Sequence, residues 1–170
     1  MGGSASACSA VASSDVGRAE RVVLEAIVGL AVDTLAEVTA ASLTLVGKAA
    51  PVSTVTSDPR LRHVVECQFA EGRGPFMRAA GISHPVSIDD LRGAVDRSPP
   101  AAWRECALAE GFQAWLCVLV PVPEDRVAAL DLFADKPTSW TGEVTAAVER
   151  LAEHAGEAIA LARRQDLGPG

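Results

Sequence analysis

Apolar residues recur every three or four positions in two long segments near the ends of the chain. One segment runs from Asp15, a residue type that caps helices, to about Val38, and the other runs from about Thr141 to Arg164. Charged residues interrupt the pattern on the opposite side of each segment. This period predicts two amphipathic helices that each bury one face against another layer of the molecule.

Shorter segments between these helices follow the pattern of strands. Alternation predicts a half-buried strand at Ser42–Val46, and Val52–Ser57, rich in valine and threonine, follows it as a hairpin partner. Ala114–Val122 is apolar on both faces, which is typical of a central strand, and Arg126–Ala134 pairs back with it. A shorter strand is expected at Pro85–Ile88. The two hairpins predict an antiparallel sheet.

Short helices are expected in the middle of the chain. An Asp-Pro pair at Asp58 opens one that runs to about Phe69, and Ala101–Glu110 forms another that ends at Gly111 with a left-handed residue. A further helical turn is expected at Phe76–Ala80. The element order predicts an α+β fold in which the terminal helices cover one face of the sheet and short helices and loops cover the other.

The length of 170 residues is that of one domain, which we assign to 15–166. Residues 1–14 are small and polar and predict a disordered leader, and 167–170 form a tail. The leader lacks the basic start and apolar stretch of a signal peptide, so we expect a cytoplasmic location and free thiols for the cysteines.

Composition also excludes two kinds of partner. The formal net charge is −7 and no face gathers lysine and arginine, which argues against nucleic acid. No apolar run approaches the roughly 18 residues that a membrane span needs, so no membrane partner is expected.

Three segments, in order, resemble the GAF domains of actinobacterial regulators, particularly those that precede ANTAR RNA-binding domains. Ala41–Val46 is similar to their first strand, Phe69–Phe76 to their "Glu-Gly-x-Gly-Pro-Cys" turn, and Val120–Val122 with Ala128–Ala134 to their central hairpin. The likeness extends over residues 16–164. It implies a six-stranded antiparallel sheet, a pocket on the face opposite the terminal helices, and a homodimer formed through those helices.

The chain also departs from that pattern. Phe76 stands where many relatives carry cysteine, and Asp131 stands where they often carry asparagine. The sequence leaves no room for an ANTAR domain, so the resemblance does not imply RNA binding. The resemblance also does not identify the partner to which such a domain would pass a signal.

Alternation along the second hairpin places a carboxylate among apolar side chains. Trp115 and Cys117 share a face of one strand, and Asp131 and Phe133 share a face of its partner. A buried carboxylate is costly unless it is paired or bound to a ligand. The ligand-binding residues that we predict on this basis are Phe69, Phe76, Trp103, Trp115, Cys117, Asp131 and Phe133.

Two interpretations of Asp131 stay open. In one, the aromatics line a pocket and the carboxylate contacts a ligand, whose identity and any cofactor the sequence does not rank. In the other, the aromatics fill a closed core and Asp131 pairs with an arginine of the covering segments, for which the candidates are Arg73, Arg78 and Arg104.

Catalytic and metal-binding patterns are incomplete. His63 and Cys67 share a helix face, but two ligands do not make a site, and a third would have to arrive through the fold. The free methionine sulfoxide reductases, which are GAF domains, need a reactive thiol and a resolving thiol, and Phe76 occupies the thiol position of their turn.

The sequence therefore predicts a sensory or regulatory domain that is not an enzyme and that binds a small molecule or a signalling partner. An interaction-only scaffold with a closed core is the alternative. A redox enzyme of the sulfoxide reductase kind is the third hypothesis.

Overall fold

The computed structural model describes residues 9–12, 16–47, 51–70, 84–93, 100–123 and 126–168. Its helices are α1 (Arg18–Thr34), α2 (Leu61–Ala70), α4 (Ala101–Ala109) and α5 (Gly142–Leu167). Its strands are β1 (Ser9–Ala12), β2 (Ala40–Gly47), β3 (Pro51–Thr56), β4 (Val86–Ile88), β5 (Ala114–Val120) and β6 (Arg126–Ala134). The helical turn expected at Phe76–Ala80 lies outside the described residues.

All the strands join one antiparallel sheet, in the order β1-β3-β2-β6-β5-β4. The hairpins β2–β3 and β5–β6 are those that alternation predicted, and β2 and β6 meet at the centre of the sheet. The α+β class, the antiparallel sheet and the terminal helices on one face are thereby confirmed.

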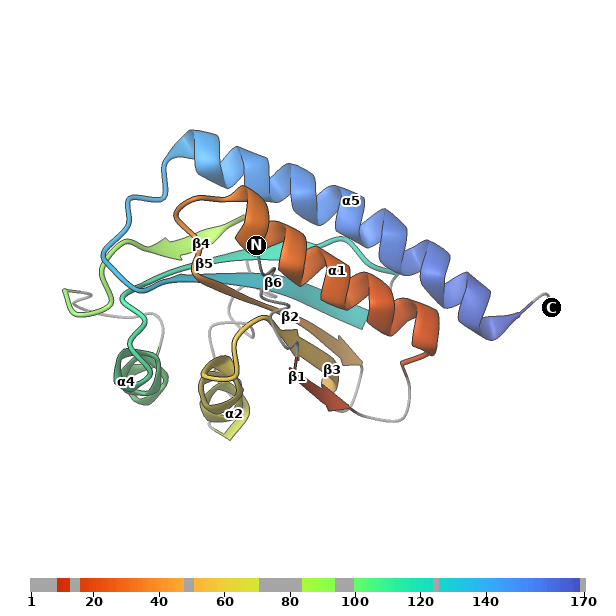
Figure 1. The fold of residues 1–170 in the computed structure, drawn as a ribbon, viewed down its shortest axis with the longest axis horizontal. Helices are drawn as coiled ribbons and strands as arrows, with labels where there is room; N and C mark the ends of the chain where they lie inside the picture. Colours follow the sequence, from red (N-terminus) through yellow and green to blue (C-terminus); the bar gives the residue numbers. More distant parts are fainter. Residues whose placement is uncertain are drawn as a thin grey trace, which may run out of the picture.

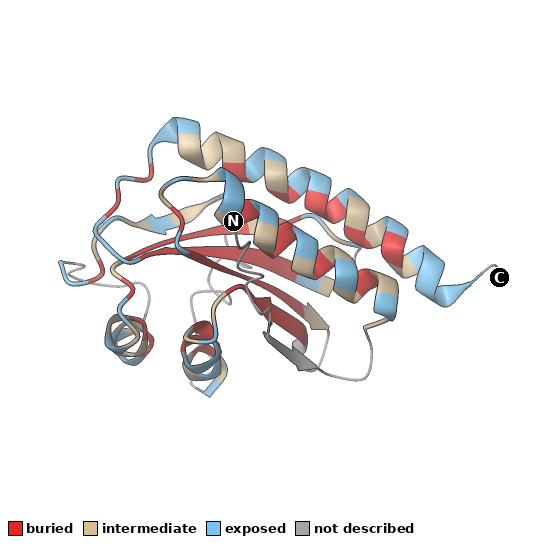
Figure 2. Cartoon of the chain, viewed as in Figure 1, coloured by how far each residue is buried: buried red, intermediate tan, exposed pale blue. Residues whose placement is uncertain are grey.

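The terminal helices α1 and α5 lie side by side over one face of the sheet (Figure 1). Their inward residues, among them Leu24 and Ile159, form one core with the strand residues Leu116 and Leu130. Figure 2 shows buried residues on the inner side of each helix and exposed residues on the outer side. This distribution follows directly from the three-to-four-residue period.

The shorter helices α2 and α4 lie under the opposite face of the sheet (Figure 1). A second core fills this side, and its buried members include Leu61, Trp103, Phe112 and Trp115. Gly111 has φ +90°, so the chain turns there in the left-handed conformation that the sequence predicted after α4. The sheet therefore separates two distinct apolar layers.

The first helix is shorter than predicted at both ends. It begins after Gly17 and ends at Thr34, because Leu35 is already extended. Val38 is still buried, but it packs from the connection between α1 and β2, after a turn at residues 36–37. The predicted cap, Asp15, lies outside the described residues.

Two expectations about the remaining chain differ from the structure. Ser9–Ala12, within the stretch expected to be disordered, pairs with β3 as an edge strand, since backbone hydrogen bonding to a strand edge needs no large side chains. Cys67 and Cys106, expected as free thiols, form a disulfide. None of the described helices is both long and apolar enough to cross a membrane.

Candidate functional site

The register of the β5–β6 hairpin brings the predicted residues together. Trp115 lies opposite Phe133, and Cys117 lies opposite Asp131. Because side chains of a strand alternate between faces, all of them point to the layer beneath α2 and α4. The sequence prediction of a shared face is correct for this hairpin.

Helix α4 adds Trp103 to this face. The Trp103 ring contacts that of Trp115 edge-on, with centroids 5.3 Å apart and planes at 63°. It also lies 6.2 Å from the Phe133 ring. Such tilted arrangements are the favourable ones for aromatic pairs, so these rings form a packed cluster, which Trp115 connects to Asp131.

The residues of this cluster differ at three positions from the ligand-binding residues predicted from the sequence. Phe112, which the sequence analysis did not select, packs 5.1 Å from Phe133; its position directly after the turn at Gly111 was the available signal. Phe69 is half-buried at the end of α2 and is not a member of the cluster. Phe76 lies outside the described residues.

Asp131 is buried without a salt bridge in the described part of the chain. The Trp115 Nε1–H donates a hydrogen bond of 2.9 Å to its Oδ1 atom. Burial raises the pKa of Asp131 to about 6, and hydrogen bonds from Trp115 and Cys117 limit that rise. Burial thus outweighs the two hydrogen bonds, and the carboxyl changes charge near pH 6.

Cys117 acts here as a hydrogen-bond donor. Burial, together with the neighbouring Asp131 carboxylate, raises the pKa of the Cys117 thiol well above its usual value. A protonated thiol is a poor nucleophile, because the thiolate is the reactive form. These surroundings therefore favour the protonated thiol at Cys117.

The indole of Trp103 has an unused polar group. The side chain is 1% exposed, yet its Nε1–H has no hydrogen-bond acceptor among the described residues. Leaving a buried donor unpaired costs about 1–3 kcal/mol, and such groups are rare in native proteins. An acceptor supplied by a bound molecule removes that cost.

A second group of reactive side chains lies between α2 and α4. The Cys67–Cys106 disulfide joins the two helices. Near this bond, the Nδ1–H of His63 on α2 donates to the carboxylate of Glu110, the residue directly after α4, over 2.9 Å. The sequence placed His63 beside Cys67, but only the fold brings Cys106 to them.

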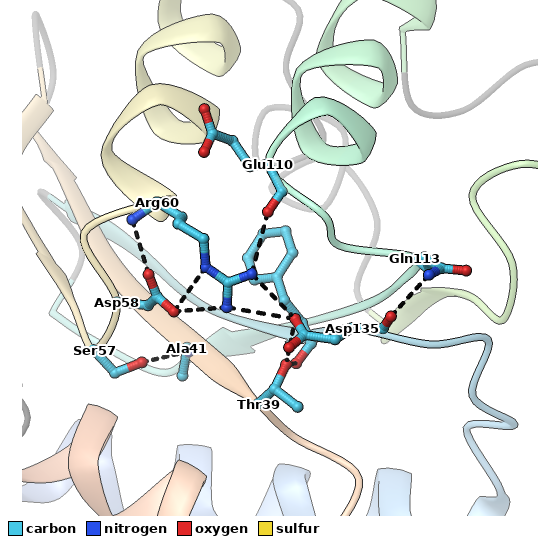
Figure 3. A network of polar contacts seen from close by, with 9 residues as sticks. Thr39, Ala41, Ser57, Asp58, Arg60, Glu110, Gln113 and Asp135 are labelled. Atoms are coloured by element: carbon cyan, nitrogen blue, oxygen red, sulfur yellow. Dashed lines mark hydrogen bonds and ion pairs between the residues drawn. The ribbon is translucent and has the colours of Figure 1, made fainter.

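Arg60, directly before α2, makes polar contacts with Asp58 and with the segment that follows α4 (Figure 3). Its guanidinium donates to Asp58 and to the Glu110 carbonyl, and it lies 4.5 Å from the centre of the Phe112 ring. Burial opposes ionisation of Asp58, but the hydrogen bonds from Arg60 outweigh it and hold the Asp58 pKa below its ordinary value. This contact set fixes α2 against the turn after α4.

The similarity to known proteins lies in structure. No protein-family model and no curated protein sequence matches this chain. The GAF domain/HD domain protein from Geobacter sulfurreducens matches with a TM-score of 0.62 and 15% identity, over 86% of this chain and 95% of that chain. The GAF3 domain of a Synechocystis sp. PCC6803 protein, in its photoproduct state, matches with a TM-score of 0.63 and 14% identity, over 85% and 95%.

An enzyme shares the same architecture. The free methionine-R-sulfoxide reductase from Neisseria meningitidis, solved with its substrate, matches with a TM-score of 0.56 and 13% identity, over 85% of this chain and 86% of that chain. At such identities the likeness shows the fold alone. The chain has the GAF fold, as the resemblance of its sequence to GAF domains implied.

Proposed function

We propose that this chain is a sensory or regulatory domain that binds a small molecule on the sheet face covered by α2 and α4. One observation carries the proposal: the buried Trp103 Nε1–H, beside the hydrogen-bonded Trp115 and Asp131, has no acceptor in the part of the chain that the structure describes. A ligand that offers an acceptor to Trp103 satisfies that donor. The surrounding rings favour a flat or apolar body.

The proposal assigns no catalytic step to this site. Cys117 is held protonated, and its partner Asp131 is engaged by the Trp115 indole. Neither group is presented as a base or nucleophile. The described residues thus support binding, with Asp131 as a contact whose charge changes near neutral pH.

Native mass spectrometry of the purified protein, with Trp103→Phe as the test variant, examines this proposal. The change keeps a six-membered aromatic ring and removes the five-membered ring with its unpaired N–H, and the control variant below makes the same truncation. We expect a molecule that co-purifies with the parent to be lost, or bound at least tenfold more weakly. Trp140→Phe is the matched control, because the Trp140 indole already donates to the Ile88 carbonyl on the other face. Equal ligand retention in both variants contradicts the proposal.

A redox enzyme is the second candidate, and the Cys67–Cys106 disulfide favours it. Two thiols reduce a sulfoxide to a sulfide and water while they become a disulfide, which an external thiol must then reduce. Cys67 packs against the second core, which contains the aromatic cluster, so the pair lies on the same side of the sheet as the candidate pocket. Under our leading proposal, free methionine sulfoxide is not turned over with dithiothreitol. Turnover that Cys106→Ser abolishes favours the enzyme instead.

Assembly and location complete the proposal. We propose a homodimer through the terminal helices, whose outward faces leave Val22, Leu30, Leu161 and Leu167 exposed. We also propose a cytoplasmic location. Disulfides are rare in that reducing compartment, so the proposal implies that Cys67 and Cys106 are oxidised there only transiently. The likeness to the domains of ANTAR regulators rests on the three sequence segments alone.

A further inference from the structure

Three metal-binding side chains converge between α2 and α4. His63 and Cys67 come from α2 and Cys106 comes from α4, and one donor atom from each lies within 4.8 Å of the others. Around a tetrahedral zinc ion with Zn–S of about 2.3 Å, two sulfurs lie about 3.8 Å apart. Once the disulfide is opened, the three donors are therefore close enough to share one ion after side-chain rotation.

A carboxylate orients the imidazole of this group. Glu110 accepts the proton of His63 Nδ1, and this leaves Nε2 as the ring nitrogen with a free lone pair. Metal-bound histidines usually donate their other ring N–H to a carboxylate or carbonyl, which fixes the tautomer and strengthens the ligand. The His63–Glu110 contact does not involve the cysteines, and it has the form commonly found behind metal-bound histidines.

The chemistry of the donors selects the class of ion. Two thiolates and one imidazole suit zinc, and a set with three protein ligands leaves a fourth position for water. The His63 side chain is 55% exposed and the two cysteines are partly exposed, so a reductant and an ion can reach them from solvent.

We propose that His63, Cys67 and Cys106 form a zinc site that the redox state of the cysteines switches on and off. In the oxidised chain the sulfurs are bonded to each other and bind no metal. A reductant opens the disulfide to two thiols, and zinc binding then releases their two protons. A peroxide reverses the change: the zinc dithiolate, one peroxide and two protons give the disulfide, free zinc ion and two waters.

Such a site gives the domain a second input besides its candidate pocket. The α2–α4 pair is held by an S–S bond in one state and by a metal ion in the other. Both helices cover the second core, which contains the aromatic cluster, since Leu61 of α2 and Trp103 of α4 belong to that core. The inference does not rest on the proposed ligand pocket, because none of the three metal ligands is Trp103 or Asp131.

Cobalt titration of the full chain tests the site. The chain is prepared oxidised or reduced with a phosphine, which opens the disulfide by taking up oxygen from water and adds no competing thiol. We expect the reduced chain to bind one Co²⁺ with a thiolate-to-cobalt charge-transfer band, which one equivalent of Zn²⁺ removes. The oxidised chain should give no band. This comparison needs no variant, so a folding defect cannot obscure it.

Variants then identify the ligands. His63→Ala, which retains both cysteines, should weaken Zn²⁺ binding by at least 100-fold, and Glu110→Gln by about 10- to 100-fold through loss of the orienting contact. His154→Ala is the matched control, since His154 is an exposed histidine on α5, and its affinity should equal that of the parent. Equal cobalt binding by the oxidised and reduced chains overturns the proposal. So does unchanged affinity in His63→Ala.

Discussion

At the scale of single residues, the unusual features are a buried acid and a buried unpaired donor. Asp131 keeps its proton more tightly in the folded chain than in the unfolded one, because burial raises its pKa from 3.8 to about 6. Trp103 loses a hydrogen bond to water on folding and gains none among the described residues. Each feature reduces the stability of the free domain, which is common where a site is built for binding.

The titration of Asp131 predicts a pH dependence of stability. A raised acid pKa means that the group's favourable contribution is complete below pH 3.8 and is lost as pH rises through about 6. The free energy of unfolding should therefore fall by about 3 kcal/mol from this group across that window. Urea titrations between pH 4 and 7 measure it.

Asp131→Asn is the variant that isolates this effect. Asparagine keeps the volume and an acceptor for the Trp115 indole, so the variant should lack the downward slope and should be at least as stable as the parent at pH 7. A loss of several kcal/mol at pH 7 would indicate instead that the charge is paired within a closed core.

The unpaired indole N–H of Trp103 leads us to expect different losses of stability from two similar substitutions, Trp103→Phe and Trp140→Phe. Both changes leave the space of the five-membered ring unfilled, but Trp103→Phe removes a donor that has no acceptor among the described residues, so it should destabilise the ligand-free domain less than Trp140→Phe does. Trp140→Phe breaks a 3.2 Å hydrogen bond to the Ile88 carbonyl, and it should cost about 1 kcal/mol more. Thermal unfolding of both variants gives the comparison, and the opposite order would mean that the Trp103 donor is satisfied.

At the scale of helices and strands, contacts between the terminal helices determine where they begin. The Asp166 carboxylate, near the end of α5, accepts the backbone N–H groups of Ala19 and Glu20 at 3.0 and 2.9 Å. These are first-turn donors that the helix itself cannot satisfy. A Cβ at Gly17 would meet Asp166 at 2.1 Å, so the close approach requires glycine there. The cap of α1 therefore comes from the far end of the sequence.

Removing this cap should destabilise the domain measurably. Asp166→Ala leaves two N–H groups of α1 without a protein acceptor and should cost about 1 kcal/mol. Glu157→Ala, an exposed carboxylate elsewhere on α5, is the matched control and should be close to neutral. Chemical denaturation distinguishes them, and equal stabilities would exclude a capping role for Asp166.

Two helix glycines should respond to alanine in opposite directions. A Cβ at Gly156 of α5 would lie 2.0 Å from the Pro121 carbonyl oxygen, so Gly156→Ala must displace α5 from the end of β5. We expect a loss of about 2 kcal/mol or more. At Gly29 of α1 a Cβ meets nothing within 4 Å, so Gly29→Ala should stabilise the helix by about 0.5–1 kcal/mol. Unfolding midpoints of the two variants on opposite sides of the parent would confirm both.

At the scale of the whole molecule, the sheet divides the chain into a supporting side and a candidate binding side. On the supporting side, the inner faces of α1 and α5 pack against the sheet. The candidate binding side holds the aromatic cluster, Asp131 and the disulfide. A dimer through the outer faces of α1 and α5 would leave the binding side accessible.

The proposed dimer has a direct test in solution. Light scattering at micromolar concentration should give twice the monomer mass of 17.6 kDa. Replacing Val22 and Leu161, both exposed on the terminal helices, with glutamate should return the monomer without loss of folded structure. If the parent protein is monomeric, α1 and α5 bury apolar surface only against their own sheet, and the dimer proposal is wrong.

The elements and their faces are properties of the sequence itself. Period and alternation depend on neighbours within a few residues, and they predicted α5, the β5–β6 hairpin and the shared face of Trp115 and Asp131 to within a few positions. They also predicted the two layers, because an apolar face must be covered wherever it occurs.

Only the tertiary structure decided which distant side chains meet. Cys67 and Cys106 are 39 residues apart, and their bond, like the His63–Glu110 contact, depends on how α2 packs against α4. The same holds for the Asp166 cap, 147 residues from Ala19. Local periodicity carries no information about such pairs, because the packing of whole helices on a sheet sets their separation.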